Sequence, residues 1–88
     1  MWFVTLVKFR KKITKADADA QTARLKDAEK WGLKIHHAFW TLGQYDAVIV
    51  SEAPDLKTIM RVGIGAGEHA KTETLAAVSR DEAISWLT

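Results

Sequence analysis

The sequence predicts an α+β fold in which four strands and two main helices follow one another as β-α-β-β-α-β, with a short helix added after the last strand. Three observations predict this order. Segments rich in β-branched and aromatic residues alternate with segments of helical composition. Helical segments are preceded by residues that commonly cap a helix N-terminus. A glycine-containing break divides the central apolar region into two adjoining strands.

The first strand and the first helix are expected in the N-terminal third of the chain. Residues 2–9 are apolar on both faces and rich in β-branched and aromatic side chains, which is typical of a strand. Thr14 then opens a helix over residues 15–31, with Asp17 in an acidic variant of the capping box. Gly32 is a favourable residue just beyond the end of this helix. The inward positions of the helix are expected at Ala18, Thr22, Leu25, Ala28 and Trp31.

A hairpin follows, with one strand over residues 33–42 and a shorter one over residues 46–52. Gly43 and Gln44 suit a two-residue type II′ turn, because that turn favours glycine at its first position. A four-residue loop would keep the same pairing. In this register Trp40 faces Ala47, Ala38 faces Ile49, and His36 faces Ser51.

The C-terminal half supplies one more helix, one more strand and the short tail helix. Pro54 and Asp55 suit the start of a helix, since proline is tolerated in the first turn and an acid is favourable at the positive end of the helix dipole. The glycines of residues 63–67 come after this helix and before a strand over residues 71–78. A phosphate-binding loop needs the opposite order, so this segment is interpreted as a connector. Ser79 and Glu82 form a capping box for the tail helix.

This order is the split βαβ pattern of ferredoxin-like domains. It predicts a four-stranded antiparallel sheet with both main helices on one face. The other face is left open, and only a second subunit or the tail helix could cover it.

The hairpin register also predicts which side chains reach the open face. Ile35, His37, Phe39, Val48 and Val50 are the more uniformly apolar set, and we expect them beneath the helices. The open face then carries Lys34, His36, Ala38, Trp40, Tyr45, Ala47, Ile49 and Ser51. On the last strand we expect Thr72, Thr74 and Ala76 to be on the open side. Small residues beside aromatic ones and a histidine favour a lined concavity there.

Three segments resemble a known family: WTLGQYDAVIVSEAPD (residues 40–55), FVTLVKF (residues 3–9) and KTETLAAVS (residues 71–79). Together they resemble the GYD domain family, whose glycine, tyrosine and aspartate match Gly43, Tyr45 and Asp46. The resemblance covers nearly the whole chain. It implies a single domain over residues 1–88, with a ferredoxin-like subunit in a dimeric α+β barrel. It implies no established reaction.

The candidate ligand-binding residues are His36, Trp40, Tyr45, Asp46, Thr72 and Thr74. If the protein is an enzyme, which the sequence leaves open, His36 would be the general base and Tyr45 the hydrogen-bond donor. The alternative for Asp46 is structural, since a carboxylate at a turn often bonds backbone amides. Tyr45 could equally cover the end of the sheet. Neighbouring residues of a strand point to opposite faces, so His36 and His37 are not expected to share a metal. We expect neither a metal nor a cofactor.

Size and composition predict self-association. A chain of 88 residues buries only about 60–65% of its unfolded surface. It contains no cysteine that could form a disulfide, and its four tryptophans offer large contact surfaces. The expected partner is therefore a second copy of the chain, in a homodimer or a larger assembly.

The charge pattern argues against several other partners. The net charge of +2 is weak, and the basic cluster of residues 8–15 is soon followed by acids, so nucleic-acid binding is not expected. No apolar run approaches the roughly 18 residues of a membrane span, and the N-terminal apolar run precedes its charges, the reverse of a secretory signal.

We expect a cytoplasmic homo-oligomer that binds a small apolar or aromatic ligand on its open sheet face. The alternatives are a cofactor-free isomerase or oxygenase, and a higher-order structural assembly in which Trp31 and Trp86 supply a second contact surface.

Overall fold

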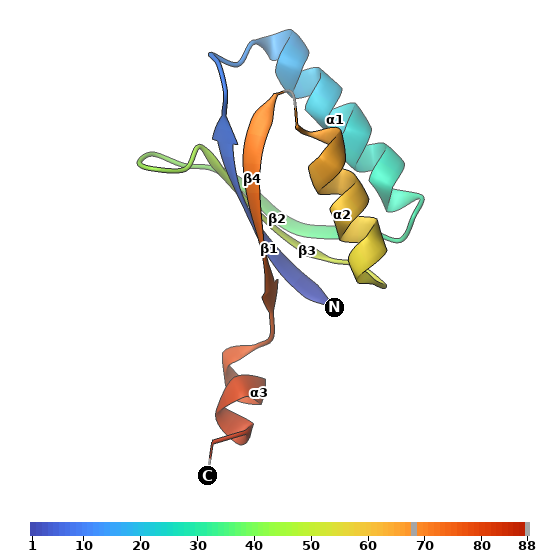
Figure 1. The fold of residues 1–88 in the computed structure, drawn as a ribbon, viewed down its shortest axis with the longest axis vertical. Coiled ribbons are helices and arrows are strands. Elements are labelled where there is room, and N and C mark those ends of the chain that lie inside the picture. Colours follow the sequence, from blue (N-terminus) through green and yellow to red (C-terminus); the bar gives the residue numbers. More distant parts are fainter. Residues whose placement is uncertain (68, 88) are drawn as a thin grey trace.

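The computed structural model describes residues 1–67 and 69–87, and its elements follow the predicted order (Figure 1). The strands are β1 (Trp2–Phe9), β2 (Lys34–Trp40), β3 (Ala47–Glu52) and β4 (Ala70–Ala77). The helices are α1 (Lys15–Glu29), α2 (Leu56–Gly65) and α3 (Arg80–Ser85). The α+β fold prediction is therefore confirmed.

The four strands form one sheet in the order β2-β3-β1-β4, and every neighbouring pair is antiparallel. The helices α1 and α2 lie on one face of this sheet, and the opposite face is open (Figure 1). This arrangement is consistent with the ferredoxin-like pattern, because β3 lies between β1 and β2 as the split βαβ unit requires.

Side-chain caps begin the helices at the predicted residues. The Thr14 hydroxyl accepts a hydrogen bond from the Asp17 amide at 3.2 Å, and the Asp17 carboxylate accepts one from the Thr14 amide at 3.0 Å. The carboxylate of Asp55 caps α2, and the hydroxyl of Ser79 caps α3. These caps satisfy amide groups that the first turn of a helix leaves without a partner.

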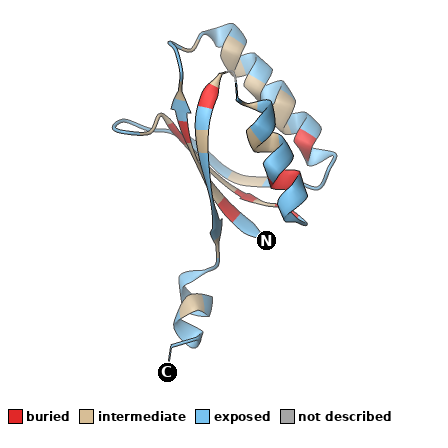
Figure 2. Ribbon diagram, in the orientation of Figure 1, coloured by how far each residue is buried: buried red, intermediate tan, exposed pale blue. Residues whose placement is uncertain are grey.

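The buried core lies between the sheet and the helices, in two clusters (Figure 2). One cluster comprises Phe3, Ala28, Leu33, Ala53 and Ile59. The other comprises Val7, Ala47 and Ala70, with Phe9 and Ile49 packed against it. Both clusters therefore use the same face of β1, since its odd-numbered residues point toward the helices.

The predicted assignment of the two sheet faces is wrong for most of the hairpin and for β4, although Ile35 and His36 lie on the faces predicted. Phe3 is buried beneath the helices and pairs with Ser51, and Val7 pairs with Ala47. The same register places these residues on the helix side: Ala38, Trp40, Ile49, Thr72, Thr74 and Ala76. The open face instead carries His37, Phe39, Val48 and Val50. Side-chain size decides this, because small residues such as Ala47 and Ser51 fit in the close-packed layer beneath the helices.

A β-bulge at His36 changes the start of the hairpin. The pairing is as predicted from Ala38 to the turn, but Ser51 pairs with Ile35 instead of His36. The extra residue leaves both His36 and His37 on the open face. The prediction that these two histidines point to opposite faces is therefore wrong.

The helix α3 stands away from the sheet and from the two larger helices, at the end of β4 (Figure 1). Most of its residues are exposed (Figure 2). It contributes to an elongated molecule of 49 × 31 × 18 Å. Among the described residues, no helix combines the length and the apolar character that crossing a membrane requires.

Candidate functional site

A pocket of about 170 Å³ lies between the sheet and the two larger helices. Residues of β1 and β4 that face the helices form its floor, together with Ile49 of β3. These floor residues are Thr5, Val7, Phe9, Ala70, Thr72 and Thr74. Leu25 of α1 and Ile59 and Val62 of α2 line the opposite wall. The small side chains of the floor leave room beneath the helices, and the mainly apolar walls favour an apolar ligand.

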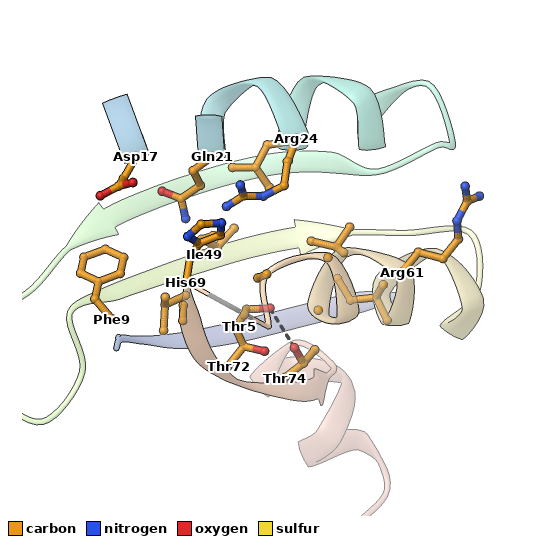
Figure 3. Close-up of a pocket in the computed structure, with 18 of the residues that line it drawn as sticks. Thr5, Phe9, Asp17, Gln21, Arg24, Ile49, Arg61, His69, Thr72 and Thr74 are labelled. Atoms are coloured by element: carbon orange, nitrogen blue, oxygen red, sulfur yellow. Dashed lines mark hydrogen bonds between the residues drawn. The ribbon is translucent and has the colours of Figure 1, made fainter. Parts of the chain in front are cut away.

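Three half-buried polar side chains line this pocket: Gln21 and Arg24 of α1, and His69 of the turn before β4. Their polar ends gather over the sheet in Figure 3. Within residues 1–67 and 69–87, no side-chain hydrogen bond or ion pair occupies any of the three. The hydroxyls of Thr5 and Thr74 are bonded to each other at 3.2 Å on the floor. The pocket therefore combines an apolar interior with a group of hydrogen-bonding side chains.

The two carboxylates that line the pocket have other partners. The backbone and side-chain hydrogen bonds of Thr14 hold the pKa of the Asp17 carboxyl below its ordinary value of 3.8. Asp27 forms an ion pair with Lys30 at 3.5 Å. Arg24 has no such partner within the described part of the chain, so the available charge in the pocket is positive.

The open face carries a second group of aromatic and titratable residues. The ring of His36 stacks on Trp2 with the centroids 4.4 Å apart, and its Nε2–H donates a hydrogen bond to the Glu52 carboxylate at 2.8 Å. The ring of His37 stacks on that of Phe39 at 5.8 Å. His36 thus lies on the face that the sequence predicts, while Trp40 lies on the other face.

The turn between β2 and β3 is a four-residue loop. The Thr41 amide donates to the Asp46 carbonyl at 2.8 Å, and this bond closes the loop over residues 42–45. Gly43 has a φ of 110°, a left-handed conformation in which side chains are strained. The predicted pairing is kept because a four-residue loop and a two-residue turn give the same register here.

Tyr45 and Asp46 connect this loop to the other side of the sheet. The Tyr45 hydroxyl donates to the Glu73 carboxylate at 3.0 Å, and that bond raises the pKa of the Tyr45 hydroxyl, helped by the carboxylate's charge. The Asp46 carboxylate accepts from the Phe9 amide at 2.8 Å and lies 3.8 Å from the Lys8 ammonium. Asp46 thus fixes the end of β1. This agrees with a structural role, and the contacts reach a strand outside the turn that contains Asp46.

The predicted ligand-binding residues fall in two separate places. Thr72 and Thr74 line the pocket, and Trp40 packs edge-on against the pocket residue Phe9 at 5.5 Å. His36, Tyr45 and Asp46 do not line the pocket. His36 and the hydroxyl of Tyr45 lie on the open face, where each bonds a carboxylate. The structure therefore does not bring the six candidates into one site.

The sequence did not predict the group formed by Gln21, Arg24 and His69. A signal for Gln21 is present, because it lies at helical spacing from the inward positions Ala18 and Leu25. A polar residue at such a position is unusual unless it meets a partner or a ligand. No local pattern joins His69 to α1, since only the folded chain brings the two together.

Comparison with known proteins gives one match, to a protein family. A search of curated proteins found no match. The family model described as GYD domain matches residues 3–87. Because this match spans nearly all of the 88 residues, the chain belongs to the GYD domain family.

Proposed function

We propose that this protein is a homo-oligomeric binding module. It self-associates through the open face of its sheet and binds a small, mostly apolar ligand in the pocket on the helix side. Self-association rests on the apolar character of the open face. This face carries Trp2, Val4, Leu6, Phe39, Val48, Val50 and Leu75. Phe39 is 57% exposed and Leu75 is 44% exposed, which is typical of a surface that a partner covers.

A second copy of the chain is the partner that fits this face best. A two-fold axis brings the same surface of two subunits together, so an apolar sheet face is automatically matched by its own copy. Charged residues of both signs lie among the apolar ones, at Lys8, Glu52, Lys71 and Glu73. Opposite charges can then pair across the axis. A stable dimer of standard size buries about 800 Å² on each subunit.

Ligand binding rests on the pocket between the helices and the sheet. Its walls come from α1, α2 and three strands, so the fold itself holds the space open. The open face and the pocket lie on opposite sides of the sheet. Pairing of two subunits through the open face therefore leaves the pocket of each subunit accessible to a ligand. Cytoplasmic localisation stays a prediction.

Light scattering at micromolar concentration tests the assembly. We expect the wild-type protein to be a dimer or larger, and Phe39→Glu to be a monomer, because it places a charge in the apolar interface. Leu42→Glu is the matched control, since Leu42 is fully exposed at the tip of the loop, at 102%, and should leave the assembly intact. A wild-type monomer would refute this part of the proposal.

The alternative, a cofactor-free isomerase or oxygenase that uses His36 and Tyr45, stays a prediction. The pocket contains neither side chain, so it lends that assignment no support. Both are hydrogen-bonded to carboxylates, Glu52 and Glu73.

A further inference from the structure

We infer that the pocket selects a ring-sized carboxylate, with the ring in the apolar interior and the carboxylate held by Arg24, Gln21 and His69. This inference rests on the proposed binding function and adds the chemical class of the ligand. It depends on the size of the pocket, on its charge, and on the kind of donors that its polar side chains offer.

The size of the pocket limits the apolar body of the ligand. Its volume is about 170 Å³. A cavity of about 150 Å³ in an apolar protein core accepts benzene. The interior therefore holds about one six-membered ring or a short branched alkyl group.

The charge of the pocket favours an anion over a neutral or cationic ligand. Arg24 and Lys11 line the pocket, and neither forms an ion pair within residues 1–67 and 69–87. The lining acids are committed to other groups, Asp17 to the cap of α1 and Asp27 to Lys30. A third cation, Arg61, lies 3.8 Å over the ring of Trp31. Among the described residues, the charge of Asp17 acts on Lys11, whereas Arg24 is a lining cation without an acidic partner and favours an anion over a cation.

The polar side chains match a carboxylate in their hydrogen bonding. The guanidinium of Arg24 offers paired N–H donors in one plane, and a carboxylate accepts two such bonds side by side. Gln21 adds an amide N–H₂ from the same helix, and an imidazole N–H of His69 can donate from across the pocket. Figure 3 shows these three groups converging from α1 and from the turn before β4. Because they are half-buried, their bonds to an anion are less weakened by water than bonds at the surface.

Calorimetric titration with three probes of one size tests this inference: benzoate, benzyl alcohol and benzylammonium. We expect benzoate to bind at least about tenfold more tightly than benzyl alcohol, which is the ordinary gain from hydrogen bonds to a charged group. Benzylammonium should bind more weakly than either. Equal affinity for benzoate and benzyl alcohol would overturn the inference while leaving the proposed binding function intact. Binding of none of the three would overturn both.

A charge-removing substitution localises the selectivity. Arg24→Gln should reduce benzoate affinity about tenfold and leave benzyl alcohol affinity within about twofold, so that the preference between them disappears. Lys26→Gln removes the same charge from an exposed position of α1 outside the pocket and should keep the preference. Unchanged benzoate binding in Arg24→Gln would exclude Arg24 as the anion contact. If Arg24→Gln fails to fold by circular dichroism, the wild-type comparison of benzoate with benzyl alcohol still decides the inference.

Discussion

At the scale of single residues, the Gly-x-Tyr-Asp motif divides into three separate physical roles. Gly43 allows the left-handed backbone of the loop. Tyr45 reaches from the loop to Glu73 on β4, and Asp46 accepts a hydrogen bond from the last residue of β1. The last two contacts join segments far apart in sequence, so the motif stabilises the sheet beyond its own hairpin.

The role of Asp46 predicts a stability effect. Asp46→Ala leaves the half-buried Phe9 amide without its acceptor and should lower the free energy of unfolding by about 1–2 kcal/mol. Urea denaturation measures this change. Lys8→Ala is the control, because the Lys8–Asp46 pair is partly exposed and should contribute less than about 0.5 kcal/mol. Equal effects of the two substitutions would mean that the ion pair, and not the hydrogen bond from the Phe9 amide, accounts for the stability that Asp46 contributes.

Ser51 provides a prediction of the opposite sign. It is 1% exposed, and its hydroxyl has no hydrogen-bond partner among the described residues. Ser51→Ala removes a buried polar group and should raise the free energy of unfolding by up to about 1 kcal/mol. Thermal denaturation measures the change. A clear loss of stability would show that the hydroxyl is satisfied in solution.

At the scale of elements, the carboxylates of the helix caps make the free energy of unfolding depend on pH. Hydrogen bonds from Thr14 lower the pKa of Asp17, and hydrogen bonds from Thr58 lower that of Asp55. A carboxyl whose pKa is lower in the folded state contributes stability that is present above its unfolded value, near 3.8, and is lost as the pH falls through the folded value.

The prediction is a fall in the melting temperature below about pH 4 that is smaller in the double variant Asp17→Asn, Asp55→Asn. Asparagine is a favourable N-cap residue at position 55, and at position 17 its side-chain oxygen can still accept from the Thr14 amide, so this variant should remain folded at neutral pH. Melting curves recorded from pH 7 to pH 2 measure the difference between the two proteins. Identical acid dependence would show that other carboxylates are responsible.

The elements themselves could be predicted from sequence because their signals are local. The capping residues Thr14, Asp55 and Ser79 each act on the first turn of their own helix. The face assignment could not be predicted in the same way, because the hydrophobic pattern of β2 and β3 fits either face. The deciding factor is the small volume of Ala47 and Ser51 beneath the helices, which is a property of the packed layer.

The candidate site was less predictable than the fold. The bulge at His36 adds a residue to one strand without a glycine or proline to signal it. It moves His36 to the open face, since without it His36 would pair with Ser51 on the helix side. The pocket joins α1 to the turn before β4, so Arg24 and His69 come together only through the tertiary fold. Thr72 and Thr74 were expected to contact a ligand on the open face, and they line the pocket on the other face instead.

At the scale of the whole molecule, the sheet separates two surfaces with different properties. The open face is broad and rich in large apolar side chains, and the helix side contains the pocket. The helix α3 belongs to neither, since it extends beyond the end of β4 (Figure 1). Its exposed Trp86 is available as the further contact surface that a higher-order assembly requires, while Trp31 is covered on one side by Arg61.

Removal of α3 tests whether this helix is independent of the sheet and of the two larger helices. A chain that ends after Val78 should unfold at nearly the same temperature as the full chain, because α3 adds no residue to either core cluster. Differential scanning calorimetry measures the change. A large loss of stability, together with conversion of larger assemblies to dimers, would instead mean that α3 packs against another subunit.

We expect the helix side to bind the ligand while the open face binds a second subunit. The most direct test is titration of ¹⁵N-labelled protein with benzoate, followed by amide chemical shifts. We expect the largest shifts at five residues that line the pocket: Gln21, Arg24, His69, Thr72 and Thr74. Shifts that gather instead around His36 and Tyr45, with the pocket residues unchanged, would contradict this expectation.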